Sequence, residues 1–359
     1  MLTYNHYDSN MKLRNCVIVA LSWFVCGCTH QASTGTESSS KESEKVEYRN
    51  PVYKLDCADP TIWRADDGMF YCMHTMGTKP GTLLKSTNLV DWEDSGIKPI
   101  DETEFAKCRK WGEHVWAPDV AVVNGRRMAY LTLYFGLHDA SIVALQEVSP
   151  LRFEYVGVIT RGVETGIDDT IDPEVVTDEA TGKVWLFFGS MGGIHRIQLN
   201  SSGTALAEGA EYVHVAGVHG STNPDRSKVF EGCYLHYHEG YWYLFCSSGF
   251  YNDHTYTTRV GRSKTLDGVF VDRNGFKMTE GNAETVIRSD ENDYFYGPGH
   301  DAEIFTDKKG NDWILYHCHN KGIDNAARPL MLQQVEWGKD GWPAVKGGKP
   351  VSRASAPEF

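Results

Sequence analysis

The fold is decided by two neighbouring segments, Asp59-Pro-Thr-Ile-Trp-Arg-Ala-Asp-Asp-Gly68 and Met69-Phe-Tyr-Cys-Met-His-Thr75. A carboxylate opens the first segment, a short apolar run follows, and the segment ends in the Asp-Gly pair that is typical of tight turns. The second segment is rich in aromatic and apolar residues, as β-strands are. Together the two segments predict a β-hairpin.

The same pattern recurs four more times along the chain. Its further copies open at Asp119, Asp172, Glu231 and His300, at intervals of 53 to 69 residues. Each interval leaves room for two hairpins, and repeated four-stranded units of this kind form β-propellers. We therefore predict an all-β fold, a five-bladed β-propeller over residues 51–359. A β-sandwich would need fewer and less regular strands.

The composition agrees with such a fold. Of the 359 residues, 41% are apolar and 23% are charged, which is ordinary for a globular protein and excludes disorder for most of the chain. The aromatic content of 12% and the 35 glycines favour strands and tight turns. The net charge of −13 argues against nucleic acid as a partner, because binding to phosphates needs clustered Lys and Arg.

Residues 1–28 have the pattern of a bacterial lipoprotein signal peptide. A basic region with Lys12 and Arg14 precedes an apolar run that is too short to span a bilayer comfortably. The run ends in Val-Cys-Gly-Cys, which resembles a lipobox whose Cys28 would carry the lipid. The polar residues 29–50 predict a flexible linker. We expect a secreted protein, lipid-anchored to a bacterial membrane in the periplasm or at the cell surface. A signal anchor that is never cleaved is the alternative.

The five opening residues are expected to meet at one site. In a propeller the first strand of each blade lines the central axis, so equivalent positions converge at one end of it. Four carboxylates in one place repel one another and raise one another's pKa values, which is costly unless the set is used for chemistry. For any single carboxylate, and especially for Asp119, capping a turn or binding backbone amides is the simpler interpretation.

Such a cluster suits glycoside hydrolysis, in which one carboxylic acid protonates the leaving oxygen and one carboxylate activates water. A third carboxylate nearby can keep the acid protonated. Aromatic rings would stack on the sugars, although each could equally belong to the core. The candidate rings are Trp111, Trp116, Tyr134, Phe250, Tyr251 and Tyr256.

Short motifs also stand in order at the spacing of the blades. They are Asp59-Pro-Thr-Ile, Trp116-Ala-Pro-Asp-Val120, Ile171-Asp-Pro-Glu-Val175, Phe230-Glu-Gly with Gly240-Tyr-Trp-Tyr-Leu-Phe245, and Gly297-Pro-Gly-His300. Together they resemble glycoside hydrolase family 43, a family of five-bladed propellers with inverting arabinanases, arabinofuranosidases and xylosidases. The resemblance covers nearly all of residues 51–359, and within the family it is greatest to the endo-acting α-1,5-arabinanases.

The resemblance implies a role for each matching residue. Asp59 matches the general base, Glu231 the general acid, and Asp172 the carboxylate that orients the acid and raises its pKa. His300 matches a histidine beside an ion on the axis, which we expect to be calcium. Asp119 matches a residue with a structural or substrate-positioning role.

We therefore expect Trp116, Asp119 and Tyr134 to contact the substrate, and the activity to be inverting endo-hydrolysis of α-1,5-linked L-arabinan. Several positions depart from the arabinanase pattern, namely Ala58, Met191, Gly192, Cys233 and Asp301. They leave open an exo-acting α-L-arabinofuranosidase, a β-xylosidase or a non-catalytic sugar-binding lipoprotein. The expected partner is arabinan or another arabinose-containing plant polysaccharide, and we expect a monomer that contacts the membrane through its lipid anchor only.

Two histidine pairs are spaced like metal ligands. His236 and His238, and likewise His317 and His319, alternate along predicted strands and so share a face. Neither pair has a third potential ligand at a sequence spacing typical of metal sites. For the first pair, solvated side chains beside a hairpin turn are the simpler interpretation. The six cysteines after residue 28 show no metal-type spacing, and buried thiols are the simplest interpretation for them.

Overall fold

The computed structural model describes residues 46–221, 223–322 and 327–359. These residues form five four-stranded antiparallel sheets, each built from four consecutive strands. Blade 1 contains β2 (Thr61–Arg64), β3 (Phe70–Met73), β4 (Leu84–Ser86) and β5 (Glu93–Asp94). Blade 2 contains β6 (His114–Val123), β7 (Arg126–Gly136), β8 (Asp139–Ser149) and β9 (Arg152–Arg161). Blade 3 contains β10 (Glu174–Asp178), β11 (Lys183–Phe188), β12 (Ile194–Leu199) and β13 (Val213–Ala216). Blade 4 contains β14 (Phe230–His238), β15 (Tyr241–Ser248), β16 (Thr257–Ser263) and β17 (Glu284–Ile287). Blade 5 contains β18 (Phe295–Thr306), β19 (Asp312–Asn320), β20 (Leu330–Trp337) and β21 (Pro343–Val345).

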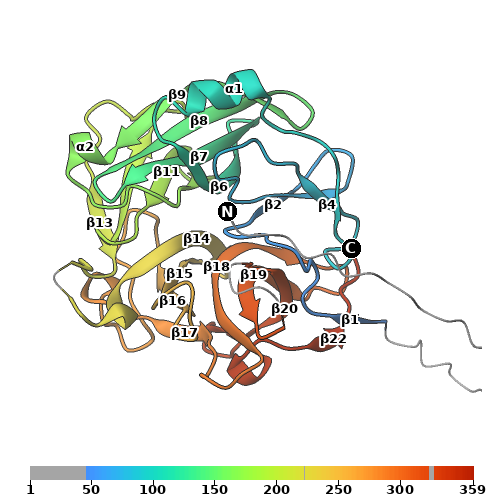
Figure 1. Ribbon diagram of the computed structural model, residues 1–359. Helices are drawn as coiled ribbons and strands as arrows, with labels where there is room; N and C mark the ends of the chain where they lie inside the picture. The colour runs from blue at the N-terminus through green and yellow to red at the C-terminus, as the bar shows by residue number, and fades with distance from the viewer. Residues whose placement is uncertain (1–45, 222, 323–326) are drawn as a thin grey trace, which may run out of the picture. The chain divides into compact units, whose positions relative to one another are not determined.

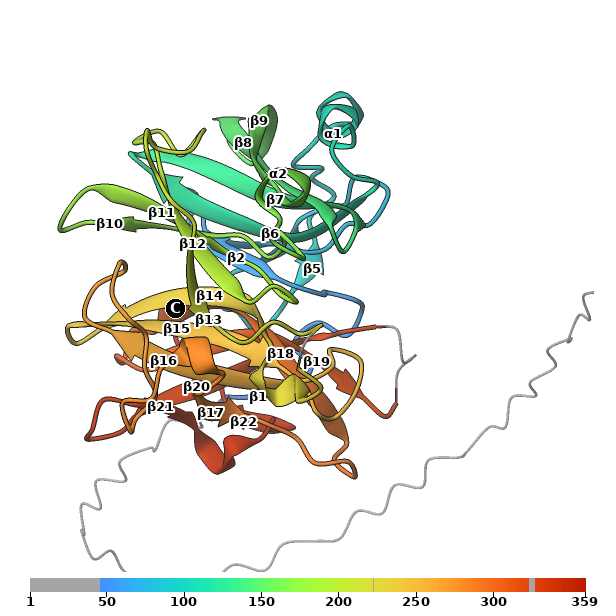
Figure 2. The same ribbon diagram turned by 90° about the vertical axis from the view of Figure 1, so that its left-hand side faces the viewer.

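The predicted five-bladed propeller is confirmed, and the sheets follow one another in chain order around the molecule (Figure 1). Each of the five repeated segments forms the first hairpin of a blade. Helical segments are few and short: α1 (Glu102–Cys108), α2 (Gly162–Thr165), and the 3-10 turns at Arg226–Lys228, Met278–Glu280 and Lys346–Gly348. Helix α1 packs beside β9 of blade 2 (Figure 2). No helix of the described residues is long and apolar enough to cross a membrane.

The ends of the described chain pair with each other. Strand β1 (Glu47–Arg49) runs antiparallel to β22 (Arg353–Ser355). The hydroxyl of the buried Tyr48 donates a hydrogen bond to the carbonyl of Leu332 at 2.7 Å. The predicted linker 29–50 therefore extends too far, because its last residues form this strand. The predicted signal peptide and lipobox lie outside the described residues.

Apolar side chains fill the space between neighbouring blades. In the described residues they form five clusters, one for each pair of adjacent blades. Between blades 1 and 2, for example, Trp63 packs edge-on against Phe153 with ring centroids 6.4 Å apart. All six cysteines of the described residues are buried free thiols. Apolar packing, and no disulfide bond among the described residues, therefore joins each blade to its neighbours.

A ring of hydrogen bonds also links every blade to the next around the axis. In each case a side chain on the first strand of one blade accepts a hydrogen bond from a backbone amide on the first strand of the following blade. The pairs are Thr61 with Val120, Asp119 with Val175, Glu174 with Leu235, Tyr234 with Ile304, and Glu303 with Ile62. This interblade ring is closed, because the pair of Glu303 and Ile62 joins blade 5 to blade 1.

Three members of the ring, Asp119, Glu174 and Glu303, carry carboxyl groups. Burial raises the pKa of each of them, and the mutual repulsion of Asp119, Glu174 and Glu303 adds to the effect at Asp119 and Glu174. For Glu303 burial raises the pKa from its ordinary 4.5 to about 7. The folded protein therefore favours the protonated forms.

We expect the substitution Glu303→Gln to flatten the dependence of thermal stability on pH. A carboxyl whose pKa is raised by folding contributes stability that is present below its unfolded pKa and is lost as the pH rises through its folded pKa. Glutamine is neutral throughout this window. Between pH 5 and pH 8 the melting temperature of the wild type should fall by a few degrees more than that of the variant. Glu280→Gln, at an exposed position, is the control, and equal slopes for all three proteins would contradict the account.

Candidate active site

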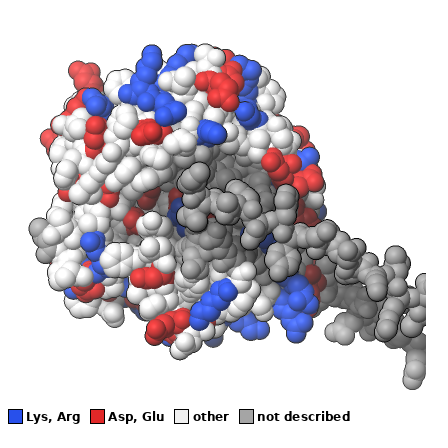
Figure 3. Space-filling view, in the orientation of Figure 1, with Lys and Arg blue, Asp and Glu red and all other residues white. Residues whose placement is uncertain are grey.

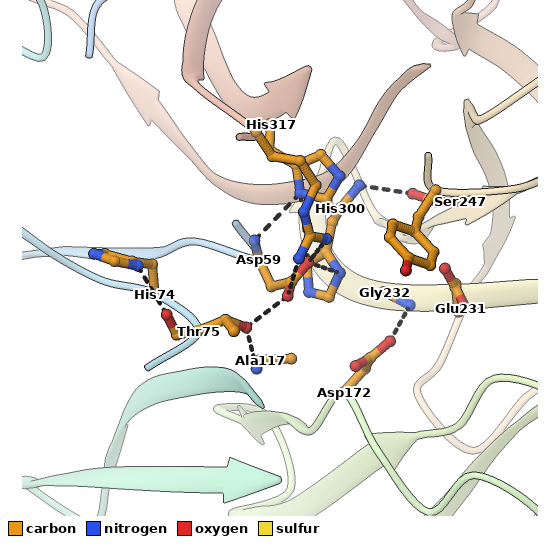
Figure 4. Close-up of polar contacts among 12 residues, drawn as sticks. Asp59, His74, Thr75, Ala117, Asp172, Glu231, Gly232, Ser247, His300 and His317 are labelled. Atoms are coloured by element: carbon orange, nitrogen blue, oxygen red, sulfur yellow. Dashed lines mark hydrogen bonds and ion pairs between the residues drawn. The ribbon is translucent and has the colours of Figure 1, made fainter. Parts of the chain in front are cut away.

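A cavity of about 440 Å³ lies at one end of the propeller axis. Four of the five predicted opening residues line it, each from a different blade: Asp59, Asp172, Glu231 and His300. Figure 4 shows the three carboxylates around the same space, with His300 beside Asp59. The predicted convergence of the three catalytic candidates is therefore what the structure has.

The fifth opening residue, Asp119, does not line this cavity. Its carboxylate belongs to the interblade ring, where it accepts a hydrogen bond from the amide of Val175 at 2.8 Å. The position of blade 2 that corresponds to Asp59 is Ala117, because the strand is irregular between Trp116 and Asp119. The prediction that Asp119 meets the other opening residues at one site is therefore wrong. The alternative interpretation is correct, because its carboxyl group binds a backbone amide.

The backbone explains why these side chains reach the cavity. Asp59, Ala117, Asp172, Gly232 and His300 all have positive φ angles, between 32° and 57°. In each blade this residue lies three or four positions before the residue whose backbone amide donates to the interblade ring. Positive φ is strained for residues other than glycine, and such strain is concentrated at functional sites. In this fold the turn of the chain at these positions directs Asp59, Asp172 and His300 to the end of the axis.

Asp59 is held by four side chains. Arg328 donates to both of its oxygens, at 2.7 and 3.3 Å, and Thr75 donates to Oδ2 at 2.6 Å. The Nδ1 atoms of His300 and His317 lie 3.3 and 3.5 Å from Oδ1. Burial alone would raise the pKa of Asp59, but Arg328, the two histidines and Thr75 hold it well below its usual value. Asp59 is therefore a carboxylate at any working pH, as a general base must be.

Glu231 lies in a different setting. The hydroxyl of Ser190 is 2.6 Å from Oε2, and that of Tyr256 is 2.7 Å from Oε1. A hydroxyl can donate or accept a hydrogen bond, so both contacts can persist whether or not Glu231 carries a proton. The two hydroxyls fix the orientation of the carboxyl group at the cavity wall.

Asp172 is buried next to Glu231. Its Oδ2 accepts a hydrogen bond from the amide of Gly232 at 3.0 Å, and its own amide donates to Thr132 at 3.0 Å. Burial raises the pKa of Asp172, and the neighbouring carboxylates Glu231 and Asp59 raise it further. Asp172 therefore keeps its proton at a pH at which an isolated aspartate would have lost it.

Aromatic side chains form much of the remaining wall. Trp116 and Tyr134 both line the cavity, and their rings stack with centroids 4.0 Å apart. Three more of the predicted rings line it: Phe250, Tyr251 and Tyr256. Trp111 is not among the lining residues and donates a hydrogen bond to Tyr155 instead. The exposed aromatic faces and the nearby carboxyl groups give the cavity the character of a sugar-binding site.

His300 contacts the general-base candidate, but the described residues around it do not form a calcium cage. Calcium takes about six to eight oxygen ligands. Next to the His300 ring stands Asp59, whose oxygens already pair with Arg328 and Thr75. The positive charge of Arg328 also opposes a cation at this place. An ion beside His300 would keep water as most of its ligands.

Sequence reasoning missed other polar residues of the cavity. Arg328, Thr75 and Ser190 contact the catalytic candidates directly. Asp169 is 8% exposed and lines the cavity, and its Oδ1 has no hydrogen-bond partner in the described part of the chain. Burial, reinforced by Glu231, raises its pKa to about 7. The one signal for Asp169 in the sequence is its place three residues before Asp172.

Comparisons with known proteins show which family the chain resembles. The family model of Glycosyl hydrolases family 43 matches residues 48–343. The chain is 30% identical to the extracellular exo-α-(1→5)-L-arabinofuranosidase of Cellvibrio japonicus, over 81% of this chain and 87% of that one. It is 28% identical to the extracellular endo-α-(1→5)-L-arabinanase 1 of Bacillus subtilis, over 80% and 86% of the two chains.

A solved structure has the same fold. The α-L-arabinanase of Cellvibrio cellulosa, complexed with arabinohexaose, aligns with a TM-score of 0.69 and 28% identity, over 82% of this chain and 96% of that one. The predicted resemblance and the predicted enzyme class, a glycoside hydrolase, are thereby confirmed. With a family match that spans most of the sequence, the chain belongs to glycosyl hydrolase family 43.

Proposed function

We propose that the protein hydrolyses α-1,5-linked L-arabinan by endo-attack with inversion of configuration. The observation that supports this most is the meeting of Asp59, Asp172 and Glu231 in one cavity lined by aromatic rings. The similarity to an arabinofuranosidase and to arabinanases supports arabinan as the substrate. A cavity of about 440 Å³ is in the size range of sites that hold ligands larger than a single pentose.

Each carboxyl group has one task in the proposed mechanism. Asp59, kept ionised by Arg328, takes a proton from the water that attacks the anomeric carbon. Glu231, oriented by Ser190 and Tyr256, gives its proton to the departing oxygen. Asp172 acts through Glu231. In the proposed active form the two neighbouring carboxyl groups share one proton, which Glu231 carries, and the charge of the ionised Asp172 opposes loss of that proton.

An exo-acting α-L-arabinofuranosidase is the second candidate, because the Cellvibrio japonicus relative carries that activity in its name. A β-xylosidase is the further alternative. Product analysis on linear arabinan, branched arabinan and xylan distinguishes them. We expect a ladder of arabino-oligosaccharides at early times. Release of arabinose alone would indicate exo-action, and release of xylose from xylan would indicate a xylosidase. Binding of the polysaccharides without any product would contradict the proposal that the protein hydrolyses them.

We expect Asp172→Asn to shift the basic limb of the pH–rate profile to lower pH. The basic limb falls where the general acid loses its proton. Removing a negative neighbour lowers the pKa of Glu231, so activity is lost at a lower pH than in the wild type. The measurement is kcat against pH on arabinan. A lower rate at every pH with an unmoved basic limb would contradict the role of Asp172.

The calcium ion at His300 also stays a prediction, and no step of the proposed mechanism depends on it. Elemental analysis of the purified protein, with activity measured before and after chelation, tests it.

We further propose that the protein is a secreted, lipid-anchored monomer. The acidic and basic side chains are interspersed on the face seen in Figure 3, which suits an enzyme whose substrate is a neutral polysaccharide. Metabolic labelling with a fatty acid, compared between the wild type and Cys28→Ala, tests the anchor.

A further inference from the structure

Two histidines of blade 4 and one aspartate of blade 5 lie together in a cluster that the proposed hydrolysis does not use. His236 and His238 alternate along β14, so their side chains lie on the same face of the strand. Asp312 is the first residue of β19 in the next blade. The potential ligand atoms of the three side chains all lie within 4.8 Å of one another, and the residues are partly buried. Asp312 is the third ligand that the sequence spacing could not identify.

We propose that His236, His238 and Asp312 bind a divalent transition-metal ion, such as Zn²⁺, which joins blade 4 to blade 5. Two imidazole nitrogens and one carboxylate oxygen suit Zn²⁺, whereas calcium and magnesium prefer oxygen ligands. Zinc–nitrogen bonds of about 2.0–2.1 Å bring tetrahedral ligand atoms to roughly 3.4 Å from one another. Small rotations of the three side chains close the site to this size, and water takes the fourth position.

The residues around the cluster orient its ligands as neighbours of metal ligands do. The Nδ1 atom of His236 lies 3.3 Å from the hydroxyl of Tyr234. If Nδ1 carries the proton of the imidazole and donates it to this oxygen, the lone pair of Nε2 is free for a metal. Tyr234 itself is fixed, because its hydroxyl also accepts the amide hydrogen of Ile304.

Trp337 holds the other two ligands. Its indole N–H donates to Oδ2 of Asp312 at 2.7 Å, and its ring stacks on that of His238 with centroids 3.7 Å apart and an angle of 6°. Thr306 donates to Oδ1 of Asp312 at 2.6 Å. A carboxylate has about four lone-pair sites, so these two hydrogen bonds orient Asp312 and leave it able to coordinate an ion.

The position of the cluster indicates a structural role. Glu231 stands near the start of β14, and His236 follows five residues later, which corresponds to roughly 16 Å along a strand. Strands β14 and β18 pack against each other, and β14 lies close to blade 5 in both views (Figures 1 and 2). An ion at the cluster therefore links two blades and is remote from the carboxyl groups of the cavity. The inference does not depend on the proposed function.

Titration of the chelator-treated full chain with Zn²⁺ tests the site. The wild type should bind Zn²⁺ and its melting temperature should rise with the zinc concentration, because the ion binds the folded state. Two variants remove a ligand and largely keep the packing. His238→Phe can still stack on Trp337. In Asp312→Asn the side-chain oxygen can still accept the indole N–H of Trp337, and the side-chain NH₂ can donate to the hydroxyl of Thr306. Each should weaken binding by about 100-fold or more, and Trp337→Phe, which removes the indole N–H and makes the stacked ring smaller, by about 10- to 100-fold.

His214→Gln is the matched control. His214 is exposed, and its ring lies 5.3 Å from that of His195. The described residues provide no carboxylate that would complete this pair as a metal site. The control should bind zinc and gain stability like the wild type. Anomalous scattering at the zinc edge from soaked crystals should give a peak between His236, His238 and Asp312. Zinc affinity unchanged in His238→Phe and Asp312→Asn, or no binding by the wild type, would overturn the proposal.

Discussion

Replacing Asp59 with asparagine is expected to abolish hydrolysis of both arabinan and an activated aryl α-L-arabinofuranoside. An amide cannot take the proton of the attacking water, and both substrates need that water to be activated. The loss in kcat should be about 10³-fold or more. The side-chain amide keeps nearly the shape of the carboxylate, so the contacts with Thr75 and Arg328 can partly persist. The measurement is initial rate on each substrate, with circular dichroism and thermal unfolding to establish that the variant is folded.

Asp67→Asn is the matched control for this variant. Asp67 lies in the first hairpin of the same blade, is exposed, and accepts hydrogen bonds from the amide of Met69 and the hydroxyl of Tyr71. Its replacement should leave both rates close to those of the wild type. A folded Asp59→Asn protein that keeps most of its activity on either substrate would show that Asp59 is not the general base.

Replacing Glu231 with glutamine is expected to separate the two substrates. The sugar oxygen of arabinan is a poor leaving group and needs the proton of Glu231, whereas an activated aryl oxygen departs with little help. We expect activity on arabinan to fall by about 10²- to 10⁴-fold, with a much smaller loss on the aryl substrate. The aryl substrate is informative only if the wild type accepts it.

Glu239→Gln, at the exposed hairpin turn that follows β14, is the matched control and should behave as the wild type on both substrates. Equal proportional losses on the two substrates in a folded Glu231→Gln protein would show that the general acid lies elsewhere. Asp169, buried in the same cavity with its raised pKa, would then be the next residue to replace.

Much of the fold followed from local patterns in the sequence. Each first hairpin combines an apolar run, a turn with glycine and an aromatic run, and these features predict strands without knowledge of the rest of the chain. The catalytic candidates Asp59 and Asp172 each precede a proline at the start of such a hairpin. The same local rule misplaced Asp119, because one irregularity in β6 moves its carboxylate from the cavity into the interblade ring.

Contacts between distant segments could not be predicted in this way. Arg328 lies in a loop without any repeated pattern, yet it makes the ion pair that keeps Asp59 ionised. The interblade ring joins residues of five different blades, and only the closed propeller brings its side chains to the amides. For the same reason the sequence showed the pair His236 and His238 but not Asp312, which approaches them from the neighbouring blade. Such partners are specified by tertiary structure and carry no local signature.

The most direct test of the account is the configuration of the sugar that is released first. Proton NMR during the first minutes of hydrolysis of linear α-1,5-arabinan distinguishes the two anomers of the new reducing end before they equilibrate. Water activated by Asp59 on the side opposite to Glu231 predicts that the β-anomer appears first and the α-anomer only later. Initial formation of the α-anomer would contradict the assignment of Asp59 as a base and would require a covalent intermediate on the enzyme.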